Sequence, residues 1–255
     1  IADALAALDA LLVQQRSFDL GQLNNIPLLV GIRAALAGGA RSFATGDDAD
    51  GLFGGYRFLR GHRDWRSYVA ERLPRIAPPA RDIGTALGCA PLFPYLAREV
   101  TEVASSLAWD DVWQVRQRDE PPSFVDQLAA GPTAAARRPW GKVALRRVAD
   151  RWLPEPVAWR PKTDLQFGSG MCALEPVLAA RVTDGIREEL DATCIAWFND
   201  AHRGLYLRFQ ELGLTIPAPR PGEYACRSCG GGVPAGRRHC GTCGCWPADQ
   251  AAGRA

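Results

Sequence analysis

The stretch TGDDADGLFGGY, residues 45–56, places three aspartates within four residues and follows them with paired glycines and a tyrosine. Carboxylates this close repel one another, so water, helix amides or a cation must neutralise them. The preceding RSFAT, residues 41–45, is too short for a helix and predicts a strand. Together the two segments predict a strand–loop–helix unit with an acidic turn at its centre.

The acidic turn is compatible with three roles at the level of sequence pattern, and register decides the first of them. A calcium loop is excluded by register, because Gly51 at the sixth position puts Gly46 at the first ligand and Arg57 at the bidentate glutamate. In the second interpretation, one aspartate caps the following helix while the others are solvated. In the third, the carboxylates hold Mg²⁺ against phosphates, and the glycines let the backbone approach closely.

Bulk composition sets the class of protein. The 255 residues, 47% of them hydrophobic, suffice for one large domain and a small appendage. A net charge of +2, from 30 basic and 28 acidic residues, argues against a nucleic acid or a membrane as partner. The sequence contains neither an apolar run of ~18 residues nor a signal-peptide pattern, so we expect a cytoplasmic protein.

Apolar periodicity predicts a mostly helical chain. We expect a helix over residues 3–16 and a second one that Asn24 or Asn25 caps, with Pro27 in its first turn and its end at Gly38. Further helical segments are expected within residues 52–73, 98–107, 141–153, 174–190 and 191–212. Residues 117–141, rich in proline, glycine and charge, predict a loop or mobile segment.

The C-terminal segment is rich in Cys, Gly and Arg and has almost nothing to pack. Two CxxC pairs, ten residues apart, suit four thiolates around a structural Zn²⁺: Cys226, Cys229, Cys240 and Cys243. Two disulfides are the alternative, but the sequence has no signal peptide. Cys245 or His239 could replace a neighbouring ligand, and Cys245 beside the cluster keeps a redox or sulfur-carrying role open.

These patterns define the expected domains. We predict a main domain over residues 1–215, a proline-rich linker over 216–223, a zinc ribbon over 224–247 and a disordered tail over 248–255.

The acidic turn resembles the S-G-E-G-A-D-E-L-F-G-G-Y signature of the asparagine synthetase family. Two further segments are similar in order and spacing: FPYLAREVTEVASSL, residues 93–107, and KVALRRVADRWLPEPVAWRPKTDLQFGSG, residues 142–170. The resemblance covers residues 20–212 and leaves the ribbon outside it. The signature matches at Gly46, Ala49, Asp50, Leu52, Phe53, Gly54, Gly55 and Tyr56.

The resemblance implies a partial α/β domain of the PP-loop ATPase (adenine-nucleotide alpha-hydrolase-like) fold, mostly helical in this chain. It implies the use of ATP and Mg²⁺ to adenylate a carboxylate, which ammonia or an amine then attacks. By this resemblance, Asp50 binds Mg²⁺ and pyrophosphate, Asp47 helps to activate the amine, and Lys162 neutralises charge as pyrophosphate forms. The further expected cofactor-binding residues are Gly46, Asp48, Lys142 and Arg160.

The sequence also departs from the family. The pyrophosphate loop S-G-G-x-D-S, which cradles phosphates with backbone amides, has no counterpart here, nor has the glutaminase domain. Near the expected acceptor pocket, Asp47 replaces a longer glutamate, Asp48 a glycine, Gly51 an acid and Ala97 an aspartate. We therefore expect a carboxylate substrate that the sequence alone does not identify.

Four hypotheses of function follow. The first is an ATP-dependent amide-forming ligase of the glutamine-hydrolysing asparagine synthetase type, of which this chain is a fragment. The second is one subunit of a split enzyme, with the pyrophosphate loop on a partner chain. The third is a sulfur- or nitrogen-inserting enzyme acting on RNA or a nucleobase, and the fourth a non-catalytic protein that binds nucleotide or docks a partner.

Overall fold

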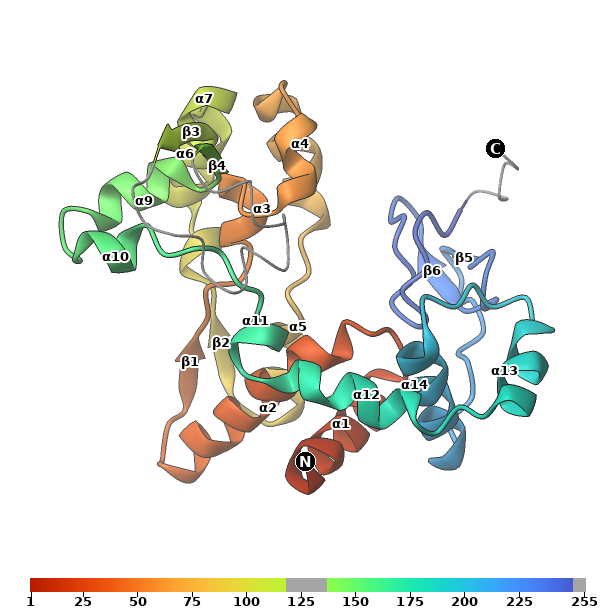
Figure 1. The fold of residues 1–255 in the computed structure, drawn as a ribbon. Helices are drawn as coiled ribbons and strands as arrows, with labels where there is room; N and C mark the ends of the chain where they lie inside the picture. Colours follow the sequence, from red (N-terminus) through yellow and green to blue (C-terminus); the bar gives the residue numbers. More distant parts are fainter. Residues whose placement is uncertain (118–136, 250–255) are drawn as a thin grey trace. The chain divides into compact units, whose positions relative to one another are not determined.

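A computed structural model describes residues 1–117 and 137–249 of the chain. The described residues are mostly helical, and their short strands pair into three two-stranded sheets (Figure 1). The expectation of a mixed, mostly helical chain is confirmed at this level, whereas the PP-loop ATPase fold stays a prediction. None of the described helices is both long enough and apolar enough to cross a membrane.

The chain divides into two compact units. The central unit spans Arg41–Thr163, and the outer unit combines Ile1–Ala40 with Asp164–Ala255. The cysteine-rich segment therefore belongs to the same compact unit as the N-terminal helices. The domain boundaries predicted at residues 215 and 223 stay a prediction.

The outer unit is built on helices that bury leucine stripes. In the first helix, Leu8, Leu11 and Leu12 are fully buried, as their spacing predicts for an amphipathic helix. Gly204 marks a close helix crossing, because a Cβ built there would lie 2.0 Å from the carbonyl oxygen of Leu178. The helices are α1 (Ala2–Gln15), α2 (Gln22–Ala37), α11 (Leu165–Gly168), α12 (Leu174–Ala179), α13 (Asp184–Asp191) and α14 (Asp200–Glu211).

The start of helix α2 differs from the prediction, whereas its end agrees with it. Helix α2 begins at Gln22, so neither Asn24 nor Asn25 caps it; instead, the Asn24 side chain accepts a hydrogen bond from the Gln166 N–H at 2.9 Å. Its predicted end at Gly38 is confirmed.

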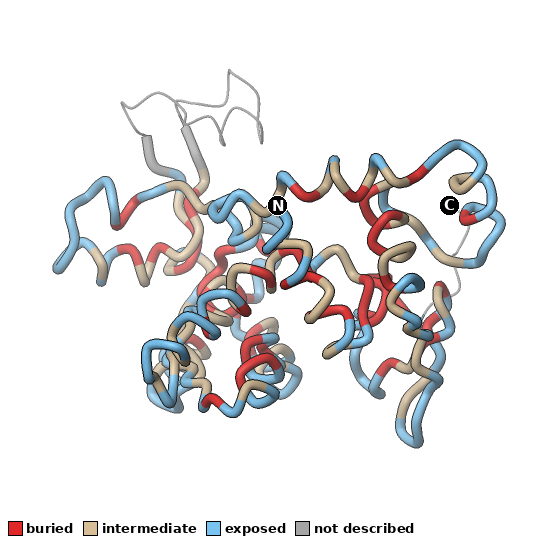
Figure 2. The backbone as a smooth tube through the Cα atoms, turned by 90° about the horizontal axis from the view of Figure 1, so that it is seen from below, coloured by how far each residue is buried: buried red, intermediate tan, exposed pale blue. Residues whose placement is uncertain are grey.

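The predicted helix over residues 174–190 is wrong as one element, because Thr183 caps a new helix, α13, after α12 has ended. The helix predicted over residues 191–212 is confirmed only in its second half. Asn199 caps α14, and its side chain accepts the His202 N–H at 2.9 Å. Buried positions recur along the helices as short stretches (Figure 2).

The central unit contains a parallel strand pair, whose residues are exposed or half-buried. Strand β1 (Ser42–Ala44), predicted from RSFAT, pairs in parallel with β2 (Ala90–Leu92), and α5 (Pro79–Ala86) precedes β2 (Figure 1). Short helices follow the acidic turn, as the interrupted pattern over residues 52–73 predicts. They are α3 (Ala49–Phe53), the 3₁₀ turns η1 (Arg57–Gly61) and η2 (Leu73–Arg75), and α4 (Trp65–Arg72).

The second half of the central unit completes its core. Its elements are η3 (Pro94–Leu96), α6 (Arg98–Ser106), α7 (Trp109–Val112), β3 (Gln114–Gln117), β4 (Arg137–Trp140), α9 (Val143–Ala149) and α10 (Glu155–Ala158). Phe53, Trp65 and Trp113 lie in one buried cluster, so α3, α4 and the segment after α7 share a core. Most of the loop predicted over residues 117–141 lies outside the described residues. Its last part is not a loop, because β4 pairs antiparallel with β3.

The cysteine-rich segment forms a small hairpin of β5 (Glu223–Ala225) and β6 (Gly232–Pro234) (Figure 1). Strands of three residues are too short to be stable alone in water. Something other than strand pairing must hold this segment.

Candidate phosphate site and candidate metal centre

The three aspartates of the acidic turn each have a different partner. The Thr45 hydroxyl donates to Asp47 Oδ2 at 2.8 Å. The Arg72 guanidinium, at the end of α4, donates to Asp48 Oδ1 at 2.5 Å. The chain's own side chains therefore neutralise much of the turn. The interpretation in which an aspartate caps the next helix is wrong, because Asp48 stands at the N-cap of α3 without a side-chain capping bond.

The third aspartate, Asp50, pairs with a lysine far away in sequence. Lys142 Nζ lies 3.0 Å from Asp50 Oδ1, and both side chains are about a quarter exposed. The Lys142 N–H also donates to the Phe53 carbonyl at 3.0 Å, which fixes the backbone before α9 against the end of α3. Asp50 and Lys142, both expected cofactor-binding residues, are thus in direct contact.

Burial perturbs two acidic groups of this turn. It raises the pKa of Asp47; the Thr45 hydroxyl partly offsets this, and the neighbouring Asp48 adds to it. Burial also raises the pKa of Tyr56, and the charge of Asp50 acts in the same direction. An aspartate with a raised pKa is a better proton acceptor than a fully solvated one.

The paired glycines leave room for neighbouring atoms that approach the backbone too closely for any side chain. A Cβ on Gly55 would lie 1.6 Å from Asp50 Oδ1, so only glycine leaves room for that carboxylate. Gly54 has φ 74°, a conformation that glycine adopts without strain. On the opposite segment, a Cβ on Gly141 would lie 1.9 Å from the Gly54 carbonyl oxygen. These glycines bring the segment that carries Lys142 onto the acidic turn.

A cavity of about 280 Å³ opens beside the acidic turn. Four residues expected from the sequence, Asp50, Lys142, Arg160 and Lys162, line it together. Gly46, Asp47 and Asp48 do not line it, although they belong to the same turn. The remaining lining residues are Ala49, Tyr95, Leu145, Arg146, Ala149, Leu153, Val157, Ala158, Pro161 and Thr163.

The cavity contains every lysine of the chain. The sequence has 30 basic residues, and Lys142 and Lys162 are its only lysines. Arginine is the basic residue at every other position counted among these 30. A lysine ammonium is a compact point charge, whereas guanidinium is a planar fork, so the two are not interchangeable at a phosphate. This scarcity is visible in the sequence, and our sequence analysis missed it.

Arg146 is a second residue that the sequence analysis missed. It is buried in α9, and its guanidinium donates to the carbonyl oxygens of Gly141, Ala158 and Arg160, each at 2.9 Å. These carbonyls belong to the two segments that present Lys142 and Arg160. Arg146 therefore holds the two cationic segments at a fixed separation. Its burial distinguishes Arg146 from an ordinary surface arginine, and burial cannot be read from the sequence.

The charge of the cavity wall is positive. Among the described residues that line it, Asp50 is the only carboxylate, against Lys142, Arg146, Arg160 and Lys162. Within the described residues, Lys162 forms no ion pair, and its Nζ lies 5.8 Å from the ring centre of Tyr56. Such a wall suits an anion with several negative charges. One carboxylate fits Mg²⁺ that is held mainly by substrate phosphates, and does not fit an all-protein metal cage.

The four predicted zinc ligands come together. The Sγ atoms of Cys226, Cys229, Cys240 and Cys243 all lie within 4.8 Å of one another. The Sγ atoms of Cys226 and Cys243 are 3.8 Å apart, and those of Cys229 and Cys240 are 3.7 Å apart. A tetrahedron with Zn–S bonds of about 2.3 Å has S–S edges of about 3.8 Å. The cluster can therefore hold a metal ion such as zinc, and all eight cysteines are free of disulfides.

The two CxxC turns have the same backbone geometry. In each, the N–H of the first cysteine, Cys226 or Cys240, donates to the carbonyl five residues later. The N–H four residues later donates back to the carbonyl of that cysteine. The residue after the second cysteine is Gly230 or Gly244, each with φ 75°. Two matching turns facing each other present four thiolates to one point.

The two alternative ligands lie outside the cluster. The Cys245 carbonyl accepts the Cys240 N–H at 3.0 Å, and its Sγ faces the Pro247 carbonyl at 3.7 Å. His239 Nε2 lies 3.2 Å from Asp19 Oδ2, and this contact raises the pKa of His239. Neither residue joins the four-sulfur group.

The ribbon packs on the helices of the outer unit. The Phe18 N–H, in the α1–α2 loop, donates to the Thr242 carbonyl at 2.7 Å, beside Cys243. The Ala196 N–H donates to the Ser228 hydroxyl at 2.8 Å, between Cys226 and Cys229. Both turns of the ribbon are therefore tied to the helical part of the unit.

Comparisons with protein-family models and with curated proteins found no match for this chain. The resemblance to the asparagine synthetase family thus stays a prediction from the residues that carry it.

Proposed function

We propose that the central unit carries the phosphate-binding part of an ATP-dependent amide-bond-forming synthetase of the asparagine synthetase type. The supporting observation is the convergence of Asp50, Lys142, Arg160 and Lys162 on one cavity. These residues come from segments far apart in sequence, so their meeting does not follow from local pattern alone. The proposed reaction joins a carboxylate, activated by adenylation, to ammonia or an amine.

Each of these residues has a proposed role that follows from its chemistry. Lys142, Arg160 and Lys162 bind the polyphosphate and offset the negative charge that develops as pyrophosphate leaves. Asp50 would hold Mg²⁺, which when bound neutralises phosphate oxygens. Asp47, which belongs to the same turn but does not line the cavity, has a pKa raised by burial and would accept the proton of an amine that attacks from outside the cavity. Arg146 positions the two cationic segments.

This assignment covers the pyrophosphate side of the site. The sequence contains no S-G-G-x-D-S loop, so the proposed adenylation requires that loop from another segment or a partner chain. The proposal for the ribbon is a structural zinc that stabilises the outer unit. We propose a cytoplasmic location because all eight cysteines are free of disulfides and because the proposed reaction uses ATP.

The experiment is a calorimetric titration of the chain with magnesium pyrophosphate. We expect binding with a stoichiometry of one, weakened at least tenfold in Lys162→Ala and in Lys142→Ala. Lysine-to-arginine variants keep the charge but change its shape, and we expect them to bind more weakly than the parent chain. Arg75→Ala is the control, because Arg75 is an exposed cation of the central unit outside the cavity.

Two results would contradict the proposal. One is the absence of pyrophosphate binding. The other is binding that the lysine variants and the Arg75 control reduce to the same extent, since that would reflect bulk charge. If pyrophosphate binds but the chain completed with a pyrophosphate loop catalyses no ATP–pyrophosphate exchange, the non-catalytic nucleotide-binding alternative replaces the synthetase.

A further inference from the structure

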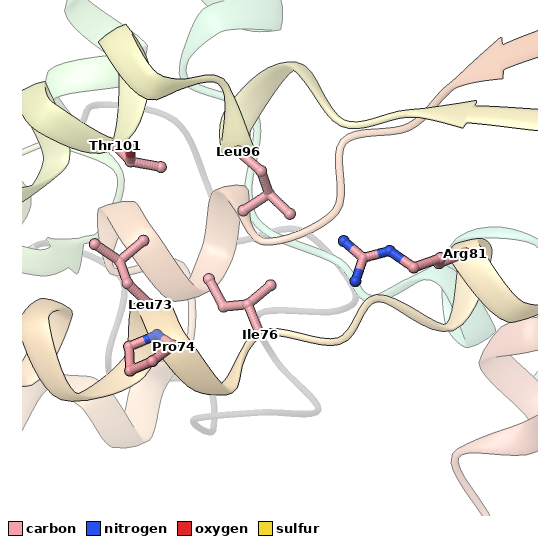
Figure 3. Close-up of a pocket in the computed structure, with 6 residues that line it drawn as sticks. All are labelled: Leu73, Pro74, Ile76, Arg81, Leu96 and Thr101. Carbon is pink, nitrogen blue, oxygen red and sulfur yellow. The ribbon is translucent and has the colours of Figure 1, made fainter.

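A second, larger cavity lies in the central unit. It measures about 510 Å³, within the range of about 300–1,000 Å³ that is usual for small-molecule pockets. Figure 3 shows its lining side chains facing a common space between η2, η3, α5 and α6. They are Leu73, Pro74, Ile76, Arg81, Leu96 and Thr101.

Most of this wall is apolar. Leu73, Ile76 and Leu96 pack one side against the core of the central unit and remain partly exposed toward the cavity. Such half-covered aliphatic side chains are stabilised when a ligand removes them from water, by about 25 cal/mol per Å² of apolar surface. The main driving force for binding here is therefore the burial of an apolar group.

Arg81 is the one charged side chain among the described residues that line this cavity. Arg81 is exposed, and within the described residues its guanidinium forms no ion pair with a carboxylate; it lies 5.4 Å from the ring centre of Phe93. The Thr101 hydroxyl donates to the Arg98 carbonyl at 2.9 Å, so only its lone pairs remain for a ligand. A guanidinium with a free edge binds carboxylate through paired, charge-assisted hydrogen bonds. The same charge repels an ammonium group.

The cavity touches two segments that also build the phosphate site. Leu73 follows Arg72, which holds Asp48, and Leu96 follows Tyr95, which lines the smaller cavity.

We propose that this cavity binds a small organic acid with an aliphatic chain, with its carboxylate on Arg81 and its chain among Leu73, Ile76 and Leu96. The inference goes beyond the proposed function and holds whether or not the phosphate site is catalytic.

The test is a calorimetric titration of the full chain with butyrate, hexanoate and octanoate. We expect affinity to rise about fourfold per added methylene, because burying a methylene contributes about 0.8 kcal/mol. In Arg81→Gln, we expect octanoate affinity to fall at least tenfold, while affinity for the neutral octanamide stays within twofold. Arg75→Gln is the matched control, because Arg75 is an arginine of the same region that does not line the cavity.

Three outcomes would overturn the inference. They are no octanoate binding, octylamine binding as tightly as octanoate, or equal losses in Arg81→Gln and Arg75→Gln. Magnesium pyrophosphate binding, measured on the same samples, reports the phosphate site separately. We expect Arg81→Gln to leave it unchanged, so failure of one proposal is distinguishable from failure of the other.

Discussion

Replacing Gly55 by alanine is expected to disable the phosphate site while leaving the central unit folded. The added Cβ would lie 1.6 Å from Asp50 Oδ1, closer than real Cβ contacts, so the carboxylate must retreat by about 1.4 Å or more. Two of the three obstructing atoms, Oδ1 and Cγ of Asp50, belong to a carboxylate that can rotate, whereas the third, Asp50 Cβ at 2.7 Å, moves only with the backbone. The carboxylate therefore rotates away from Lys142 Nζ, now 3.0 Å from it, and the backbone shifts by a few tenths of an ångström.

The expected cost to folding is modest. Overpacking costs about 1–3 kcal/mol in general, and an obstacle that is mainly a rotatable carboxylate favours the lower end. Loss of a partly exposed ion pair adds at most about 1 kcal/mol. We therefore expect Gly55→Ala to lower the free energy of unfolding by about 1–2 kcal/mol, measured by urea unfolding followed by circular dichroism.

Gly61→Ala is the matched control, because a Cβ there meets nothing within 4 Å. We expect the control to change stability by less than about 0.5 kcal/mol and to bind magnesium pyrophosphate like the parent chain. Gly55→Ala should bind it at least tenfold more weakly. Equal pyrophosphate affinities in the two variants would refute the argument that the position of the Asp50 carboxylate matters.

Two further predictions concern the outer unit. Metal analysis should find one zinc per chain, lost in Cys240→Ser and kept in Cys245→Ser, because Cys245 Sγ lies outside the four-sulfur group; zinc loss in both would contradict that ligand set. Burial lowers the pKa of His202 from 6.5 to about 4, so between these pH values the unfolded state binds a proton that the folded state does not. Stability should fall by about 3 kcal/mol as pH drops through that window, and His202→Gln should remove this part of the pH dependence; an unchanged profile would rule out His202 as its source.

Local sequence pattern predicted an element correctly where a single feature, such as the spacing of apolar residues or of cysteines, determines it. The leucine spacing of α1, the short RSFAT strand and the two CxxC pairs were all predictable, because each depends on residues close in sequence. The break between α12 and α13 was harder, since the apolar spacing continues across it and only Thr183 signals a new start.

The arrangement of the phosphate site depends on contacts that local pattern does not contain. Arg72 reaches Asp48 over 24 residues of sequence, and Lys142 reaches Asp50 over a longer separation. Family resemblance selected Lys142, Arg160 and Lys162 as candidates; the fold shows that they line one cavity.

The most direct test of the phosphate site is lysine footprinting by mass spectrometry. The chain has only two lysines, so an amine-directed acetylating reagent reports on Lys142, Lys162 and the amino terminus alone. We expect magnesium pyrophosphate to slow acetylation of both lysines at least fivefold and to leave the exposed amino terminus unchanged as the internal reference. Equal acetylation of both lysines with and without magnesium pyrophosphate would contradict the assignment of this cavity to phosphate.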